Sequence, residues 1–428
     1  MSPELETLTQ QAKAHPTRRF IALAHRLTPA FLHETWTLMN RRGAPGVDGE
    51  TPREFEAALG ERCARLVARL KARQYVAPPV RRVEIPKGAG KTRPLGIPTV
   101  EDRLLQRAVA RLIEAVYEAD FFDGSYGFRP GRSAHDALRQ LRHHIVADKT
   151  RWVFEADIRG YFNHIQHEWL LKMVAHRIGD GALLRLLAKW LHAGVMDHGV
   201  RVRTEEGTPQ GGPISPVLAN IYLHYVLDLW FERRFRPGCQ GEAHRVRFAD
   251  DFVVTFQDSR DAERFATALR ARLGQFGLEL AEEKTRLLPF GRFARDRQPH
   301  GTRLPTFDFL GFTHVSGRTW DDRFTLVRIP AQKSLRKFLD QVHTWLVAHR
   351  HWRRRDQQAH LRAMLTGFYQ YFGLHHCRRK LWWVYYEVQR QWRTQLRRRS
   401  QRHRMFWSFL QTRDWFRLPQ PTLTHPTV

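Results

Sequence analysis

Two adjacent carboxylates, Asp250 and Asp251, stand in the middle of the alternating apolar stretch HRVRFADDFVVTF, residues 244–256. Successive side chains of a strand point to opposite faces, so the pair fits a tight turn between two packed strands. A third carboxylate, Asp157, ends the apolar stretch RWVFEADI. Clustered, partly buried carboxylates repel one another unless they take up protons or bind cations. If the strands lie side by side, the three aspartates can form a cation site.

Magnesium is the ion that such a site favours, because it is hard, prefers oxygen ligands and also binds substrate phosphates. Two such ions about 3.5–4 Å apart stabilise the attacking and leaving oxygens of an in-line phosphoryl transfer. The aspartates are therefore candidates for nucleotide addition with two Mg²⁺ ions, with Mn²⁺ as a substitute. Asp-Asp is also common in turns for structural reasons, so the pair alone does not decide the function.

The charge of the whole chain points to a polyanionic partner. It has 71 Lys and Arg against 43 Asp and Glu, a formal net charge of +28. Phosphates neutralised by these cations release counterions, so nucleic acid is the leading partner. We see no apolar run long enough for a bilayer and no secretory core at the amino terminus, so we expect no membrane partner and a cytoplasmic location. The three cysteines are too far apart for a local disulfide framework or a CxxC zinc site.

The elements that must position the aspartates follow from periodicity and turn residues. Asp157 is expected at the end of a strand, and the Asp-Asp pair between two strands. Residues 80–97 predict a hairpin with a cationic tip. From Ala331 onwards the pattern is almost entirely amphipathic helix, so we expect a boundary near Pro330 and a mixed α+β part before it. The helices expected before that boundary are 1–30, 101–117, one from about 133, 166–177, 181–194, 217–235 and one capped by Asp258 or Ser259 that runs to Phe276.

Seven blocks in a fixed order carry a family resemblance: GAPGVDGET, VRRVEIPKGAGKTRPLGIPT, SYGFRPGRSAHDAL, VFEADIRGYFNHI, GTPQGGPISPVLANIYL, RFADDFVV and FDFLGF. Together they resemble the reverse transcriptases of bacterial group II introns, from about residue 40 to 312. The resemblance implies a right-hand polymerase with an antiparallel palm sheet and a helical thumb. The domains expected are an N-terminal helical extension (1–38), fingers (39–120), palm with remaining fingers elements (121–330), thumb or maturase region (331–390) and a basic nucleic-acid-binding tail (391–428).

The resemblance also implies roles for single residues. Asp157 would be the metal ligand of the first palm strand, and Asp250 with Asp251 the pair in the palm hairpin. Phe248 stands where the family usually has Tyr, so packing near the primer end would lack the hydroxyl. Phe162 matches the aromatic that crowds the sugar 2′ position and so would favour deoxynucleotides, with a core role as the alternative. The nucleotide-binding residues implied are Gln210 and Gly211 in TPQGG, and Arg81, Lys87 and Arg93 on or beside the fingers hairpin.

The carboxyl-terminal part has no acidic residue from 388 to 413. Such a region suits RNA, whose helices are gripped through phosphates and 2′-hydroxyls. The resemblance implies a maturase that binds intron RNA, with an intron RNA template, a DNA target or primer and dNTPs as partners. It also implies the type without an endonuclease domain, because no paired Cys/His cluster follows. The nucleic-acid-binding residues expected are Arg378, Arg379, Lys380, Arg390, Arg393, Arg397, Arg398 and Arg399.

Two other functions remain open from the sequence. The chain could be a splicing cofactor whose RNA binding matters more than its polymerase activity, in which case Asp250→Ala would still support splicing. It could also be a domesticated reverse transcriptase of a phage-defence or CRISPR adaptation system. The GAPGVDG block and the maturase-like tail argue for an intron origin, and the genomic neighbours, flanking intron RNA or adjacent defence genes, separate these possibilities.

Overall fold

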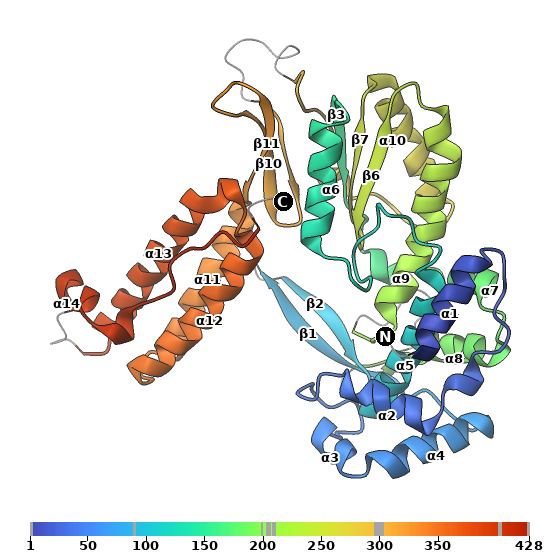
Figure 1. Cartoon of the computed structure of the whole chain (residues 1–428). Coiled ribbons are helices and arrows are strands. Elements are labelled where there is room, and N and C mark those ends of the chain that lie inside the picture. The colour runs from blue at the N-terminus through green and yellow to red at the C-terminus, as the bar shows by residue number, and fades with distance from the viewer. Residues whose placement is uncertain are drawn as a thin grey trace.

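The computed structural model describes residues 3–88, 91–197, 200–202, 207, 211–294, 304–400 and 405–425. The predicted combination of helices with antiparallel sheets is confirmed, and Figure 1 shows the carboxyl-terminal helices grouped on one side of the sheets. Among the described helices, none is both long enough and apolar enough to cross a membrane.

A four-stranded sheet in the order β6-β7-β3-β8 is antiparallel throughout. Its strands alternate between two apolar faces. Phe154 and Val254 belong to one core, which α10 covers, whereas Val153 and Val253 belong to a second core beneath α6. This alternation is why each strand is buried on both faces. The elements are β3 (Trp152–Ala156), β6 (Ala243–Phe248), β7 (Asp251–Phe256), β8 (Arg286–Pro289), α6 (Ala134–Val146) and α10 (Ser259–Gly274).

The amino-terminal third is mainly helical and packs around the long buried helix α5. The single helix predicted over residues 1–30 is wrong, because α1 ends at Ala14, just before Pro16, and α2 begins at Pro29. Proline disfavours helical geometry in the preceding residue and ends the helix there. The helices of this third are α1 (Pro3–Ala14), α2 (Pro29–Thr37), α3 (Pro52–Ala57), α4 (Leu59–Lys71) and α5 (Val100–Tyr117). Those that follow later in the chain are α7 (His167–Arg177), α8 (Gly181–Leu191) and α9 (Ser215–Leu223).

The predicted cationic hairpin is present as β1 (Val80–Gly88) and β2 (Lys91–Ile97). It joins β4 (Val195–Asp197) and β5 (Val200–Val202) in a second sheet, in which β1 and β4 run parallel. In Figure 1 this hairpin rises between the amino-terminal helices and the carboxyl-terminal helical group. The helix predicted over 217–235 continues beyond α9 as two π-helical stretches, His224–Asp228 and Phe231–Phe235.

The stretch FDFLGF was expected to be one strand but forms a hairpin, β9 (Thr306–Phe309) and β10 (Phe312–Arg318), joined by Leu310 and Gly311. Both turn residues have positive φ, 50° and 77°, as a two-residue hairpin turn requires. β11 (Phe324–Pro330) completes this third sheet, and the described chain after it is helical. Those helices are α11 (Gln332–Ala348), α12 (Arg354–Phe372), α13 (Arg378–Arg397) and α14 (Trp407–Gln411).

Candidate active site

The Asp-Asp pair lies at the tip of a hairpin, as the alternation predicted. Phe248 pairs with Asp251 across the strands, so Ala249 and Asp250 form a two-residue turn. Ala249 has φ 59°, which is sterically costly for a residue with a Cβ. Strain of this kind costs on the order of 1–3 kcal/mol and persists only where surrounding contacts impose it.

Asp157 reaches the same place from the neighbouring strand. The last residue of β3, Ala156, pairs with Phe252, so Asp157 comes directly beside Asp251 at the strand ends. All three aspartates line one cavity of about 580 Å³. Residues from the β9–β10 turn and the start of α11 complete its wall. The sequence prediction that the strands gather the three carboxylates is therefore met by the geometry.

The electrostatics of this cavity favour a cation. Burial raises the pKa of Asp250, and the Asp157 charge raises it further. Burial, Asp157 and Asp250 raise the pKa of Asp251 to about 7. The Lys284 ammonium contacts Asp157 and has its own pKa raised by that hydrogen bond. The sequence did not predict a role for Lys284, which the short helical turn at 282–284 places in the wall of the aspartate cavity.

The residues present fit divalent ions. Three carboxylates supply only hard oxygen donors, and their mutual repulsion is the kind that a bound cation relieves. Another grouping, His144 with Asp148 and His244, has donor atoms within 4.8 Å of one another in the described chain. Its two imidazole rings stack at 4.0 Å and 7°, so their in-plane lone pairs cannot converge on one ion. The aspartate cavity is thus the better metal site.

A buried guanidinium, that of Arg247, holds the Ala249–Asp250 turn in place. Arg247 is fully buried, and its Nη1 donates to the Ala249 carbonyl at 2.8 Å and to Asn220 Oδ1 at 3.0 Å. Its Nη2 donates to Ser125 Oγ at 2.7 Å and to Asp228 Oδ2 at 2.6 Å. These bonds join the Ala249–Asp250 turn to α9, which carries Asn220, and to the GSYGF loop (residues 124–128), which carries Ser125. They also reach the π-helical stretch after α9, which carries Asp228.

Asp228 is the counter-charge for two arginines. Arg245 Nη1 lies 2.9 Å from Asp228 Oδ1, and both side chains have no exposed surface. Burial opposes ionisation of Asp228, but the Arg245 and Arg247 charges outweigh it and hold its pKa below the usual value. The sequence did not predict these ion pairs, because no local sequence pattern links Asp228 to Arg245 and Arg247.

The GSYGF loop approaches the turn so closely that it needs glycine. A Cβ on Gly127 would lie 2.3 Å from the Ala249 nitrogen, and Asn220 Nδ2 donates to the Gly127 carbonyl at 2.7 Å. Below 3.0 Å something must shift, and here the obstacle is backbone. The third block of the sequence resemblance, SYGFRPGRSAHDAL, thus has a physical reason, which is its contact with the Ala249–Asp250 turn.

The β9–β10 turn contacts the site from the other side. The Leu310 backbone amide hydrogen bonds the Asp251 carboxylate. Tyr371 on α12 donates its hydroxyl to the Leu310 carbonyl at 2.9 Å. His135 Nε2 lies 2.9 Å from the Tyr371 carbonyl, and its ring stacks on His425 near the end of the described chain. The carboxyl-terminal helices are thereby connected to the aspartate cavity.

The other residues expected at the site are placed as follows. Phe248 is half-buried next to the turn, and Phe162 is half-buried beside the buried Tyr161, so neither is a pure core residue. Gly211 has φ 115°, and a Cβ there would lie 2.4 Å from the Gly96 carbonyl of β2. Arg81 lies on β1, with its Nε buried and unbonded among the described residues. Gln210 and the side chains of Lys87 and Arg93 lie outside the described part of the chain.

The basic residues expected to bind nucleic acid lie on or just after α13, which crosses the expected boundary between 390 and 391 without interruption. Three of them have partners within the chain. Arg393 Nε donates to the Met405 carbonyl at 2.7 Å, and Arg399 Nη2 donates to the Trp352 carbonyl at 2.7 Å. Lys380 is half-buried, and Arg390 pairs with Glu387. The exposed members of the set are Arg378, Arg379, Arg390, Arg397 and Arg398.

Comparisons with known proteins show which proteins this chain resembles. The family model described as reverse transcriptase (RNA-dependent DNA polymerase) matches residues 85–314. The protein YkfC of Escherichia coli is 33% identical over 366 residues, which cover 77% of this chain and 92% of that protein. The group II intron-encoded protein LtrA of Lactococcus lactis is 30% identical over 386 residues.

The match to LtrA covers 73% of this chain and 64% of LtrA, so the chain spans somewhat less than two thirds of that relative. Nuclear intron maturase 1 of Arabidopsis thaliana is 26% identical over 27% of the chain. The family span contains all three aspartates and the turn that carries Asp250. The chain therefore belongs to the reverse transcriptase (RNA-dependent DNA polymerase) family, with group II intron-encoded proteins among its relatives, and is an RNA-directed DNA polymerase that depends on divalent metal ions.

Proposed function

We propose that the chain extends the 3′-hydroxyl of a primer with dNTPs on an RNA template, with Asp157, Asp250 and Asp251 as ligands of two Mg²⁺ ions. The observation that carries this proposal is the meeting of three carboxylates in one cavity at the edge of an antiparallel sheet. Ions bound there would stabilise the attacking and leaving oxygens of the phosphoryl transfer.

The remaining residues would orient the substrates. Phe162 would exclude a 2′-hydroxyl, and Phe248 would pack near the primer end. The glycine backbone at Gly211 would let the nucleotide approach closely. The residues proposed to hold the triphosphate and base are Arg81, Lys87, Arg93 and Gln210. We assign fingers to 39–120, palm to 121–330 and thumb to the helices from 331, which is supported by a cavity wall drawn from both palm and α11.

We further propose that the protein acts on a group II intron as a maturase. Its relatives LtrA and nuclear intron maturase 1 support this role. The exposed arginines of α13 supply cations for RNA phosphates, and Trp383 and Tyr386 on the same helix are 46% and 59% exposed. Intron relatives favour this assignment over a defence system.

The test compares the unaltered protein with Asp250→Asn, which removes one charge without changing the side chain's size. Primer extension with Mg²⁺ and dTTP on poly(rA)/oligo(dT) is expected to vanish in the variant. RNA binding and splicing of the intron RNA are expected to persist, because α13 is untouched. Asp123→Asn, whose side chain is 96% exposed, serves as the charge control. Extension by Asp250→Asn would contradict the metal assignment, and loss of splicing in it would contradict a separate maturase role.

A further inference from the structure

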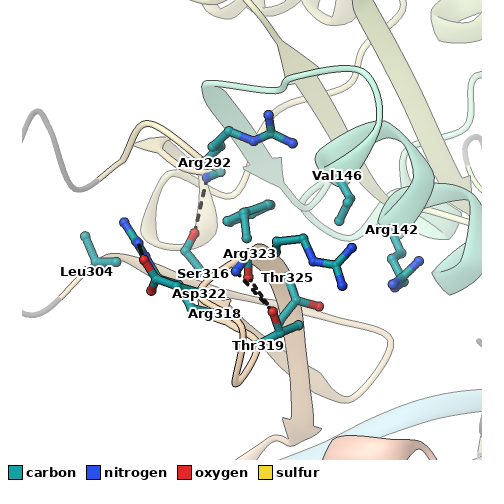
Figure 2. A pocket seen from close by; sticks show the side chains of 13 residues that line it. Arg142, Val146, Arg292, Leu304, Ser316, Arg318, Thr319, Asp322, Arg323 and Thr325 are labelled. Carbon is teal, nitrogen blue, oxygen red and sulfur yellow. Dashed lines mark hydrogen bonds and ion pairs between the residues drawn. The ribbon is translucent and has the colours of Figure 1, made fainter.

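A second cavity, of about 680 Å³, lies apart from the aspartates and shares no lining residue with their cavity. It opens between α6, the segment after β8 and the outer end of the β10–β11 hairpin (Figure 2). Its wall is strongly basic. One carboxylate, Asp322, lines it, against four guanidiniums, those of Arg142, Arg292, Arg318 and Arg323.

Two of these arginines have carboxylate partners and two do not. Arg318 pairs with Asp322, and Arg323 pairs with Asp321. Arg142 and Arg292 form no ion pair with any described residue, so their charges face the cavity uncompensated. Arg142 also lowers the pKa of the buried Arg328, in addition to the effect of burial, which shows how crowded the positive charge is here. A polyanion would relieve this repulsion.

The loop at the hairpin end carries a large aromatic side chain, Trp320, next in the chain to Thr319, which lines the cavity. Trp320 is 98% exposed, more than any other large hydrophobic residue identified on the described surface. Its loop is fixed, because the Thr319 amide donates to the Arg323 carbonyl at 2.8 Å and the Arg323 amide donates to Thr319 Oγ1 at 3.1 Å. Nothing in the described chain packs on the indole. An exposed indole on a loop whose backbone is fixed is suited to stack on an unpaired base.

We propose that this cavity and Trp320 form a second nucleic-acid site, which takes an unpaired strand outside the polymerase cavity. The guanidiniums of Arg142 and Arg292 grip successive phosphates, and a base of the same strand stacks on Trp320. Duplex nucleic acid is a poorer ligand, because its bases are already stacked on one another. The ligand chemistry, phosphodiester plus free base, is common to RNA and DNA strands.

The experiment measures binding without dNTPs, so its result is independent of primer extension. The full chain is first saturated with an unlabelled, dideoxy-terminated primer–template. Fluorescently labelled oligo(rU) or oligo(dT) is then titrated, and anisotropy is followed at several salt concentrations. The variants are Arg142→Gln with Arg292→Gln, and Trp320→Ala. Arg233→Gln with Arg260→Gln removes the same charge from exposed positions outside the cavity and is the matched control.

We expect the saturated protein to bind the labelled strand. The cavity double variant should bind at least fivefold more weakly, with its salt slope reduced by about 1.4, since each lost contact with a single strand accounts for about 0.7. Trp320→Ala should also weaken binding by about fivefold or more. The tighter of the two labelled strands identifies the natural ligand.

Three results would overturn the proposal. Absence of binding once the primer–template is in place would show that no second site exists. If the cavity variant and the Arg233/Arg260 control both bound the labelled strand equally weakly, binding would depend only on the protein's overall positive charge and not on the cavity. Unchanged binding by Trp320→Ala would show that no base stacks on Trp320, and the reason for preferring an unpaired strand would be lost.

Discussion

Arg247 is the residue on which the position of Asp250 depends most directly. Its Nη1 holds the Ala249 carbonyl, and Ala249 is the strained residue next to Asp250. Lysine in its place keeps a charge near Asp228, but its three donors sit on one nitrogen and cannot span the four acceptors that the guanidinium reaches. We expect Arg247→Lys to lower primer extension at least tenfold and to raise the Mg²⁺ concentration needed for half-maximal activity.

The matched control for this prediction is Arg245→Lys, because Arg245 pairs with the same carboxylate and is equally buried but does not contact the turn. Urea unfolding of Arg247→Lys and Arg245→Lys measures how much free energy of unfolding each variant loses. An Mg²⁺ requirement that rises equally in both would assign Arg247 to general stability rather than to placement of the turn.

His224 makes the stability of this network depend on pH. Burial lowers its pKa from 6.5 to about 4, and the charges around it are those of Asp228, Arg129, Arg245 and Arg247. Between pH 6.5 and 4 the unfolded chain binds a proton that the folded chain does not, so stability falls as the pH falls through this window. The full effect is about 3 kcal/mol.

In His224→Phe the pH-dependent contribution of His224 to stability disappears, while ring packing against Phe121 and Phe122 is kept. Urea unfolding at pH 7.5 and pH 4.5 should therefore show a smaller loss of stability in the variant than in the unaltered protein. The exposed His33→Gln should behave like the unaltered protein. An unchanged pH dependence in His224→Phe would show that His224 is protonated in the fold.

At the residue scale, the sequence predicted the aspartates well because their signal is local. Two carboxylates interrupt an apolar alternation, and a third ends another strand. It did not predict the burial of Arg245 and Arg247. These residues alternate with Val246 along the strand, a pattern that normally indicates a solvent-facing polar side. Their counter-charge, Asp228, comes from the π-helical stretch after α9, and only the tertiary fold brings it beneath the sheet.

At the scale of elements, the periodicity predicted most helices and the hairpins at 80–97 and 243–256. It failed where one backbone conformation changes the path of the chain. Pro16 follows the end of α1, and two positive φ angles at Leu310 and Gly311 turn an expected strand into a hairpin. Both signals are single residues inside otherwise regular patterns, so an average over a window hides them.

The contact between Gly211 and β2 links the β1–β2 hairpin to the start of α9. A Cβ in Gly211→Ala would lie 2.4 Å from the Gly96 carbonyl, and φ 115° is unfavourable for alanine. We expect the hairpin to shift and the KM for dNTP to rise severalfold in primer-extension assays, with a smaller change in kcat.

Gly60→Ala is the control, since a Cβ there meets nothing within 4 Å and the residue lies inside α4. It should leave the KM unchanged and stabilise the protein by about 1 kcal/mol. A normal KM in Gly211→Ala would show that the hairpin position does not govern nucleotide binding.

At the scale of the whole molecule, the carboxyl-terminal segment packs back onto the helical part. Phe416 is 2% exposed and stacks on Trp392 of α13 at 4.7 Å, while Leu374 and His425 form a β-bridge. The same core extends from α6 and the β9–β11 sheet through α11, α12 and α13. The segment after residue 400, as far as it is described, therefore supports the helices, including α13 with its exposed arginines.

Phe416→Ala tests this support. Truncating a buried phenylalanine costs about 3–5 kcal/mol, so we expect the helical part to unfold at a lower temperature and nucleic-acid binding to weaken at that temperature. Phe406→Ala is the control, because Phe406 is 57% exposed in the same segment and should change stability little. Calorimetry together with amide exchange of α11–α13 locates the effect. If Phe416→Ala melted like Phe406→Ala, the segment would be a basic tail that merely rests on α13, and the arginines there would act without its support.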